Sequence, residues 1–232
     1  MNFKEIEALT VKKCGICKGE SFLIKHVNNQ YILEDCKCVD ELKRDLKYDV
    51  AKISQEWWKF GIDDLEKDFP KNIIDDIKYF QDNVRNCVLN KVQFYFWGRN
   101  GNGKNLLSIL MLKSLIDKGY KGIFMSSFEI LNYLYTGNTD NLMVYDFIVL
   151  DEVDKVMSNK ITDTCNVIIH LLEYKSLVLL SNTSPSDLSI KLRYPQNFIE
   201  RIKNVKEIKF PDKDYRGKFQ NKFDALKGMK NV

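Results

Sequence analysis

The sequence predicts an α/β fold, in which a parallel sheet carries helices on both faces and a small zinc-binding module precedes it. Three observations support this prediction. Apolar runs that end in polar residues alternate with amphipathic helical patterns, as is typical of parallel sheets. A glycine-rich turn joins one of these runs to a helix. Two cysteine pairs lie close together near the N-terminus.

The composition is that of a globular protein. Its 232 residues suffice for one ordinary domain and a small appendage, and 44% of them are apolar while 29% are charged. No apolar run approaches the roughly 18 residues that a membrane span requires, and the first residues lack the apolar core of a signal peptide. We therefore expect a cytoplasmic protein without membrane contact, in which the six cysteines do not form a disulfide framework.

The charge is unevenly distributed along the chain. The formal net charge is +4, but residues 201–232 hold ten Lys and Arg residues against four Asp and Glu residues. This tail is therefore basic, and the rest of the chain is slightly acidic. A basic tail indicates contact with nucleic acid or with an acidic partner. A solvated C-terminus that only keeps the protein soluble is an equally good interpretation.

Four of the six cysteines form two pairs. Cys14 and Cys17 precede, and Cys36 and Cys38 follow, eighteen residues with two β-favouring runs around an Asn-Asn turn signal. A hairpin here brings both pairs together, and four thiolates at about 2.3 Å from one ion make a closed zinc site. The second pair has one intervening residue where two are commoner, so His26 is an alternative to one cysteine. So small a hairpin buries little core, and the zinc would supply its folding free energy.

A helical linker is expected after the cysteines. Apolar residues recur every three or four positions over residues 39–60, and Gly61 ends the pattern. The stretch 63–70 has the character of a linker. We therefore expect residues 1–66 to form the zinc-binding module with its linker helix, and residues 67–232 to form the main domain.

The central motif is a phosphate-binding loop within residues 92–105, VQFYFWGRNGNGKN. An apolar run predicts a buried strand, a glycine-rich turn follows, and an apolar-periodic helix begins after the lysine. The frame G-x-x-x-x-G-K lets backbone amides close around a polyphosphate, and the lysine adds a positive charge. The alternative is a glycine-rich turn without a ligand, but the strand and helix lie where phosphate binding requires them. The residues expected to bind the nucleotide are Gly98, Asn100, Gly101, Asn102, Gly103, Lys104, Asn105 and Leu106.

Asn105 departs from this motif. It replaces the Ser or Thr whose hydroxyl normally ligates Mg²⁺. An amide oxygen is a poorer ligand, so we expect nucleotide binding to persist while hydrolysis is slow.

Two further apolar runs end in residues of catalytic type. Residues 147–150 are apolar and lead into Asp151 and Glu152, as expected of a buried parallel strand with chemistry at its carboxyl end. Asp151 is expected to reach the Mg²⁺ shell, and Glu152 to polarise the attacking water. The run 177–180 leads to Asn182, which is placed to orient that water. Two acids at a strand end by accident are the alternative.

The remaining chain supplies the other elements of the sheet domain. His170, Cys87 and Cys165 have no companions at ligand spacing, so we interpret them as ordinary packed residues. The other elements expected are a helix with Ile73, Ile77, Phe80 and Val84 on one face, a strand at 122–127, a helix with Phe128, Leu131 and Leu134, a loop at 136–142, a helix at 164–174, a turn at 184–186, a helix capped by Asn197, and a last strand at 205–210.

These motifs, in this order, resemble the AAA+ ATPases of the replicative-helicase-loader family, the bacterial DnaC and DnaI proteins and their phage counterparts. The resemblance covers most of the chain. It rests on the cysteine cluster ahead of a helical linker, on GRNGNGKN, IVLDE and LLSNTS, on Glu200-Arg201-Ile202, and on Lys213-Asp214-Tyr215-Arg216-Gly217. Asp214 stands where Ser is usual in the last segment, and Glu152 where many relatives have a second Asp.

The resemblance implies roles that the residues alone do not. Arg201 would be the arginine finger, Arg216 would contact the nucleotide, and a C-terminal helical lid would be absent. The protein would bind ATP or ADP with Mg²⁺, associate with itself through its ATPase domains, and load a replicative ring helicase onto single-stranded DNA, with the N-terminal module gripping the helicase. The alternatives are a transposition ATPase of the IstB type and a nucleotide-binding adaptor that acts as a switch with little or no hydrolysis.

Overall fold

The computed structural model describes residues 14–27 and 30–217, and the chain divides into two compact units, Met1–Trp58 and Lys59–Val232. Residues 59–66 thus belong to the second unit, whereas the sequence placed them in the N-terminal module. The elements of the first unit are β1 (Phe22–Val27), β2 (Gln30–Asp35), α2 (Lys37–Val50) and the 3₁₀ turn η1 (Gln55–Trp57).

The first unit is a two-stranded antiparallel hairpin followed by a helix. Ile24 lies opposite Leu33 in the register of the hairpin. Its base is closed by a hydrogen bond from the amide of Cys36 to the carbonyl of Ser21, at 2.9 Å. The buried cluster consists of three cysteines and Leu42, against which a few half-buried apolar residues pack. This core is small, and three of its four buried residues are cysteines, so the stability of the unit depends on them.

The predicted helix over residues 39–60 is wrong beyond Val50. There α2 ends because Lys52 adopts a left-handed conformation with φ of 59°, and the amide of Ile53 donates to the carbonyl of Tyr48 at 2.9 Å. This is a Schellman-type helix end, which usually contains glycine. Because a lysine occupies the position, the sequence carries no visible stop signal.

The second unit is built on a five-stranded parallel sheet with the order β4-β5-β6-β3-β7. The fold predicted from the sequence is confirmed. The four strands β3, β4, β5 and β6 continue apolar runs, because helices cover both faces of the sheet there, whereas the edge strand β7 is mostly exposed. The strands are β3 (Gln93–Trp97), β4 (Gly122–Ser126), β5 (Phe147–Asp151), β6 (Ser176–Ser181) and β7 (Lys206–Lys209).

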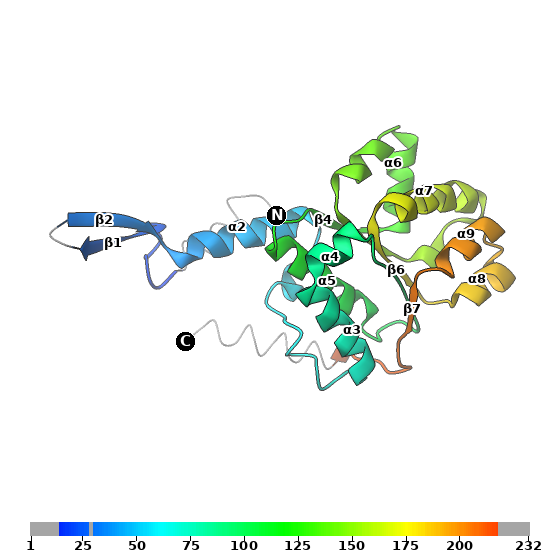
Figure 1. The fold of residues 1–232 in the computed structure, drawn as a ribbon, viewed down its shortest axis with the longest axis horizontal. Helices are drawn as coiled ribbons and strands as arrows, with labels where there is room; N and C mark the ends of the chain where they lie inside the picture. Colours follow the sequence, from blue (N-terminus) through cyan, green and yellow to red (C-terminus); the bar gives the residue numbers. More distant parts are fainter. Residues whose placement is uncertain (1–13, 28–29, 218–232) are drawn as a thin grey trace. The chain divides into compact units, whose positions relative to one another are not determined.

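Helices lie on the two faces of this sheet. In Figure 1, α3, α4 and α5 lie on one side of the strands, and α7, α8 and α9 lie on the other. The helices are α3 (Lys71–Asp82), α4 (Val84–Leu89), α5 (Lys104–Asp117), α6 (Ser127–Tyr135), α7 (Ile161–Tyr174), α8 (Pro185–Leu192) and α9 (Gln196–Ile202), with 3₁₀ turns η2 (Thr139–Val144), η3 (Val153–Lys155) and η4 (Ser158–Lys160).

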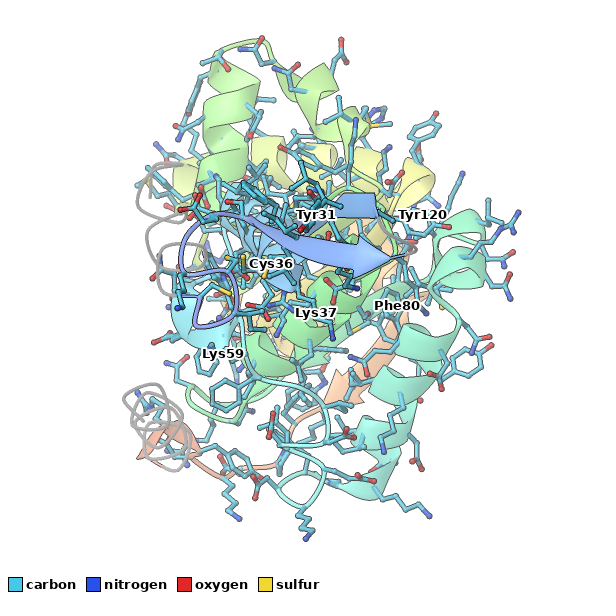
Figure 2. All side chains as sticks on the ribbon, turned by 90° about the vertical axis from the view of Figure 1, so that its left-hand side faces the viewer. Tyr31, Cys36, Lys37, Lys59, Phe80 and Tyr120 are labelled. Atoms are coloured by element: carbon cyan, nitrogen blue, oxygen red, sulfur yellow. The ribbon has the colours of Figure 1, made fainter. Side chains whose placement is uncertain are left out.

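Aromatic side chains fill the face covered by α3. The ring of Phe80, labelled in Figure 2, lies 6.2 Å from that of Phe94 and 5.1 Å from that of Phe147. These contacts hold α3 against β3 and β5. The helix α5, which begins at the phosphate-binding loop, is buried on nearly all sides. The start of α5 is therefore held rigidly at the edge of the sheet.

Three local predictions differ from the structure. The predicted turn at 184–186 is the beginning of α8: Ser184 Oγ accepts from the amide of Asp187 at 3.2 Å, and a proline occupies the first helical turn. The predicted loop at 136–142 contains the 3₁₀ turn η2. Phe198 is buried as expected, but α9 already begins before Asn197, at Gln196.

The stretch 63–70 is not an open linker. It forms turns that bury Leu65 and Phe69 within the second unit. Residues 218–232 lie outside the described residues, so the absence of a C-terminal helical lid stays a prediction. None of the described helices has the length and apolar character needed to cross a membrane.

Candidate nucleotide site and metal centre

The candidate nucleotide site lies at the carboxyl ends of β3, β5 and β6. The glycine-rich loop runs from the end of β3 to the first residue of α5, which is Lys104. Gly103 precedes this helix with φ of 89°, in the left-handed region that glycine adopts without strain. The loop therefore leads to a helix N-terminus that no side chain caps, where amide groups and the helix dipole favour an anion.

Lys104 is enclosed by oxygen atoms of the loop. Its Nζ donates to the carbonyls of Gly98 at 2.6 Å and of Arg99 at 2.9 Å, and to Asn102 Oδ1 at 3.1 Å. Burial lowers the pKa of Lys104 to about 8, and the carboxylate of Asp151 opposes part of this effect. The lysine is charged near neutral pH, but water has little access to its charge.

One buried donor in the loop lacks an acceptor. Asn102 Nδ2 is the only buried side-chain nitrogen without a hydrogen-bond partner among the described residues. An anionic ligand at the loop would satisfy such a donor and would also solvate the ammonium of Lys104. Both features fit a bound polyphosphate.

Asn105 and Asp151 face each other across the site. Asn105 Nδ2 donates to Asp151 Oδ2 at 2.5 Å. Burial raises the pKa of Asp151, while hydrogen bonds from the Glu152 amide and from Asn105 act in the opposite direction. The two side chains expected to reach Mg²⁺ are therefore adjacent, and a hard cation would take carboxylate and amide oxygens as ligands here. The amide of Asn105 presents its nitrogen to the carboxylate in this structure.

Glu152 stands in a strained backbone conformation. Its φ is 58°, which is uncommon for a residue with a side chain and costs roughly 1–3 kcal/mol. The strain is compensated by two hydrogen bonds of 2.8 Å, one from its amide to Asp151 Oδ1 and one from Ser127 Oγ to its carbonyl. The Glu152 carboxylate pairs with Lys155. The conformation turns Glu152 out of the strand direction, at the position where the sequence predicts a general base.

Asn182 follows β6 and lies beside the loop. Its Oδ1 is 3.5 Å from the Nζ of Lys104. The next residue is fixed on two sides: the Thr183 carbonyl accepts from the hydroxyl of Tyr95 at 2.8 Å, and its Oγ1 donates to Asp154 Oδ2 at 3.3 Å. The end of β6 is thus held close to β3, and the fold brings together Lys104, Asp151 and Asn182.

The segment that contains Arg216, which the resemblance places at the nucleotide, also contacts the loop. We call residues 210–216 the closing segment. The amide of Tyr215 donates to the carbonyl of Gly101 at 2.8 Å, and its ring stacks on that of Phe69 with centroids 4.7 Å apart. A Cβ atom on Gly103 would lie 2.4 Å from Phe69 Cζ. Glycine is therefore required at position 103 by a neighbouring ring as well as by φ.

Arg216 is at the loop, whereas Arg201 is at the opposite edge of the sheet. Arg201 pairs with Glu173 at the end of α7, and the carbonyl of Glu173 accepts from Lys91, which precedes β3. The amino ends of the strands lie at this edge. Within one chain, the structure does not bring Arg201 to the nucleotide site.

Several basic residues near the C-terminus have partners. Lys206 pairs with Asp76, and Lys209 lies over the ring of Trp97 with its Nζ 5.0 Å from the ring centroid. In the described part of the tail, some of the positive charges are therefore already engaged by an acidic or an aromatic side chain. Residues 218–232, which hold the remaining tail charges, lie outside the described residues.

The four cysteines of the first unit converge on one point. The four sulfur atoms lie within 4.8 Å of one another, with Cys14 Sγ 3.7 Å from Cys36 Sγ and Cys17 Sγ 3.5 Å from Cys38 Sγ. Tetrahedral thiolates around zinc at about 2.3 Å lie about 3.8 Å apart. Figure 2 labels Cys36, with yellow sulfur atoms beside it. The donor set fits a structural Zn²⁺ ion.

The clustered thiols also influence one another's ionisation. Burial raises the pKa of Cys38, and the neighbouring sulfur of Cys17 raises it further. A bound cation reverses this effect because it stabilises thiolates. The side chain of His26 lies outside the described side chains, so the alternative ligand remains a prediction. Cys87 and Cys165 are both fully buried and stand apart from this cluster.

Comparison with known proteins supports the fold. No family model and no curated protein matches the sequence. Solved structures do match. The DnaC helicase loader has a TM-score of 0.53 and 19% identity, over 68% of this chain and 100% of that one. DnaI has a TM-score of 0.55 and 16% identity, over 69% of this chain and 93% of that one.

The replication initiator DnaA bound to AMPPCP and single-stranded DNA also matches, with a TM-score of 0.57 and 17% identity over 73% of this chain. The match spans 55% of that DnaA chain, so only about half of DnaA is represented. At such identities the likeness shows the fold alone. The second unit has the fold that these proteins share over the matched part.

The first prediction concerns the metal. Protein purified without added zinc should carry about one zinc ion per chain, because four converging thiolates form a closed site. Cys36→Ser should lower the zinc content and unfold the first unit. Cys165→Ser, which removes a buried thiol outside the cluster, should leave the zinc content unchanged, and so should His26→Ala. Metal analysis decides the matter, and folded wild-type protein with less than about a tenth of an equivalent would contradict it.

The second prediction concerns the lysine. Because the pKa of Lys104 is about 8, the side chain is charged below this pH and must take up a proton on binding a phosphate above it. The affinity for MgATP should therefore fall as pH rises from 7.5 to 9.5, by up to about tenfold per unit. Lys104→Met should bind more weakly and with little pH dependence. Equal wild-type affinities at the two ends of this range, by titration calorimetry, would show that the ammonium is not used.

Proposed function

We propose that this protein uses ATP to load a replicative ring helicase onto single-stranded DNA during the initiation of replication. The observation that carries the proposal is a four-cysteine unit attached to a P-loop unit with the DnaC and DnaI fold. The site on that unit gathers a lysine, an aspartate and two asparagines at the loop. Such a set is suited to positioning a nucleotide and the water that attacks it.

The two units would divide the work. We propose that residues 1–66 grip the helicase and that the ATPase domain, residues 67–232, associates with its own copies. The basic tail would contribute phosphate contacts to single-stranded DNA. Mg²⁺ would be held by Asp151 and Asn105. Hydrolysis would be slow because the Asn105 amide must turn to present its oxygen to the ion instead of its nitrogen.

Asn105 also favours a second candidate function. A protein that binds ATP and never hydrolyses it would act as a nucleotide-dependent adaptor, and the Asn105–Asp151 hydrogen bond of 2.5 Å is compatible with such a switch. The IstB-type transposition ATPase has no comparable observation in its favour, since the four-cysteine unit supports the loader.

Helicase recruitment tests the proposal directly. The full-length protein should co-purify with the replicative helicase of its own organism in the presence of MgATP, and should stimulate unwinding from a closed circular single strand that carries an annealed oligonucleotide. A closed circle offers no end, so the ring must be opened. Lys104→Ala should abolish the stimulation, because the loop then lacks its cation.

The outcomes separate the candidates. Equal loading with ATP and with a non-hydrolysable analogue supports the switch, while loading with ATP alone supports the ATPase. Absence of both co-purification and stimulation would reject the helicase proposal and favour transposition.

Arg201 is proposed to act in trans, in the nucleotide site of a neighbouring subunit. Its position at the amino edge of the sheet, paired with Glu173, is compatible with this role. An arginine finger is worth about 10³- to 10⁵-fold in rate. The Arg201→Ala and Lys104→Ala proteins should each be inactive alone and should recover ATPase activity when mixed. The Arg201→Ala protein then supplies an intact nucleotide site, and the Lys104→Ala protein supplies an intact arginine finger. Glu173→Gln is the control, and it should keep most activity. If mixing restores nothing, Arg201 does not act across an interface.

A further inference from the structure

The closing segment holds its side chains at the phosphate-binding loop. Its first residue, Phe210, donates its amide to the carbonyl of Trp97 at 2.8 Å, which continues the pairing of β7 with β3. Arg99, within the loop, pairs with Asp212 at 3.3 Å. Together with the hydrogen bond from Tyr215 to Gly101, these contacts fix the segment over the loop at three points.

Within this segment, Asp214 engages Arg216 with both carboxylate oxygens. Asp214 Oδ1 accepts from the backbone amide of Arg216 at 2.9 Å and from its Nε at 3.1 Å. Asp214 Oδ2 accepts from Nη2 at 2.6 Å. The planar guanidinium and the carboxylate thus meet in the two-pronged geometry that makes arginine pairs specific. The hydrogen bonds from Arg216 hold the pKa of Asp214 down at about 2, so the carboxylate is ionised at physiological pH.

Both charged groups touch the loop that would receive the phosphates. A Cβ atom on Gly101 would lie 2.5 Å from Asp214 Oδ1 and 2.7 Å from Arg216 Nε. The carboxylate is therefore at the same glycine as the guanidinium. A negative charge at this place repels a polyphosphate, and it occupies the donors with which Arg216 would bind one.

We propose that Asp214 restrains Arg216, so that a nucleoside triphosphate must displace the carboxylate before Arg216 can bind its phosphates. Asp214 is then a positioning residue that weakens nucleotide binding. The inference rests on the proposed nucleotide binding at the loop. A serine at this position, usual in the proteins that the sequence resembles, has no charge and leaves the guanidinium available.

The expected effect is moderate, because the side chains are 52% and 70% exposed and water screens exposed ion pairs. Binding of a fluorescent non-hydrolysable ATP analogue with Mg²⁺ measures it on the full chain. Asp214→Asn and Asp214→Ser should each bind about three- to fivefold more tightly than wild type. Asp214→Glu should bind like wild type, because the charge and the pairing are retained.

A double-variant comparison assigns the gain to Arg216. Arg216→Ala in the wild-type background should weaken binding, because it leaves the Asp214 carboxylate without its partner beside the loop. In the Asp214→Asn background it should remove the whole gain. Thermal unfolding of each variant shows that the fold is retained.

Each outcome has one meaning. If the folded Asp214→Asn and Asp214→Ser proteins bind no more tightly than wild type, the inference is overturned while nucleotide binding stands. A gain that survives Arg216→Ala also overturns it, because the carboxylate then acts without the arginine. No binding by wild type or by any variant would reject the proposed nucleotide site, and this inference with it.

Discussion

The rest of the site depends on the hydrogen bonds between the buried ammonium of Lys104 and the oxygen atoms that surround it. Carbonyls of the loop solvate the ammonium in place of water, and they point inward only because the loop glycines adopt backbone conformations that other residues avoid. Asn182 approaches from β6, and Asp151 from β5 lowers the cost of burial. The parallel register brings the carboxyl ends of β3, β5 and β6 to one edge of the sheet, and so places these groups around the buried charge.

Much of the second unit could be predicted from the sequence, because a strand buried on both faces must be apolar throughout and its polar end is then conspicuous. The run ending in Asp151 and the glycine spacing before Lys104 are signals of this kind. The end of α2 could not be predicted, since Lys52 adopts the conformation that glycine usually supplies. The start of α8 was missed although Ser184 and the proline after it form a recognisable cap.

Long-range contacts of the site were harder to foresee. Nothing in the sequence near Phe69 indicates that its ring touches Gly103, or that Tyr215 stacks on it from the other end of the domain. Such contacts depend on how loops cross a sheet edge, and local periodicity carries no information about that. The cysteine cluster could be predicted because it depends on local structure. A short hairpin brings its two ends together, and the cysteine pairs lie at those ends.

The strand order has a consequence for the way the chain acquires its structure. β3 pairs with β6 and β7, which both follow it in the chain by a long interval. During synthesis, β3 therefore has no strand to pair with until residues 176–181 have left the ribosome. Contacts between distant segments form slowly, whereas the hairpin of the first unit joins strands separated by two residues. The first unit can therefore fold early, and the second only when nearly all of it has been made.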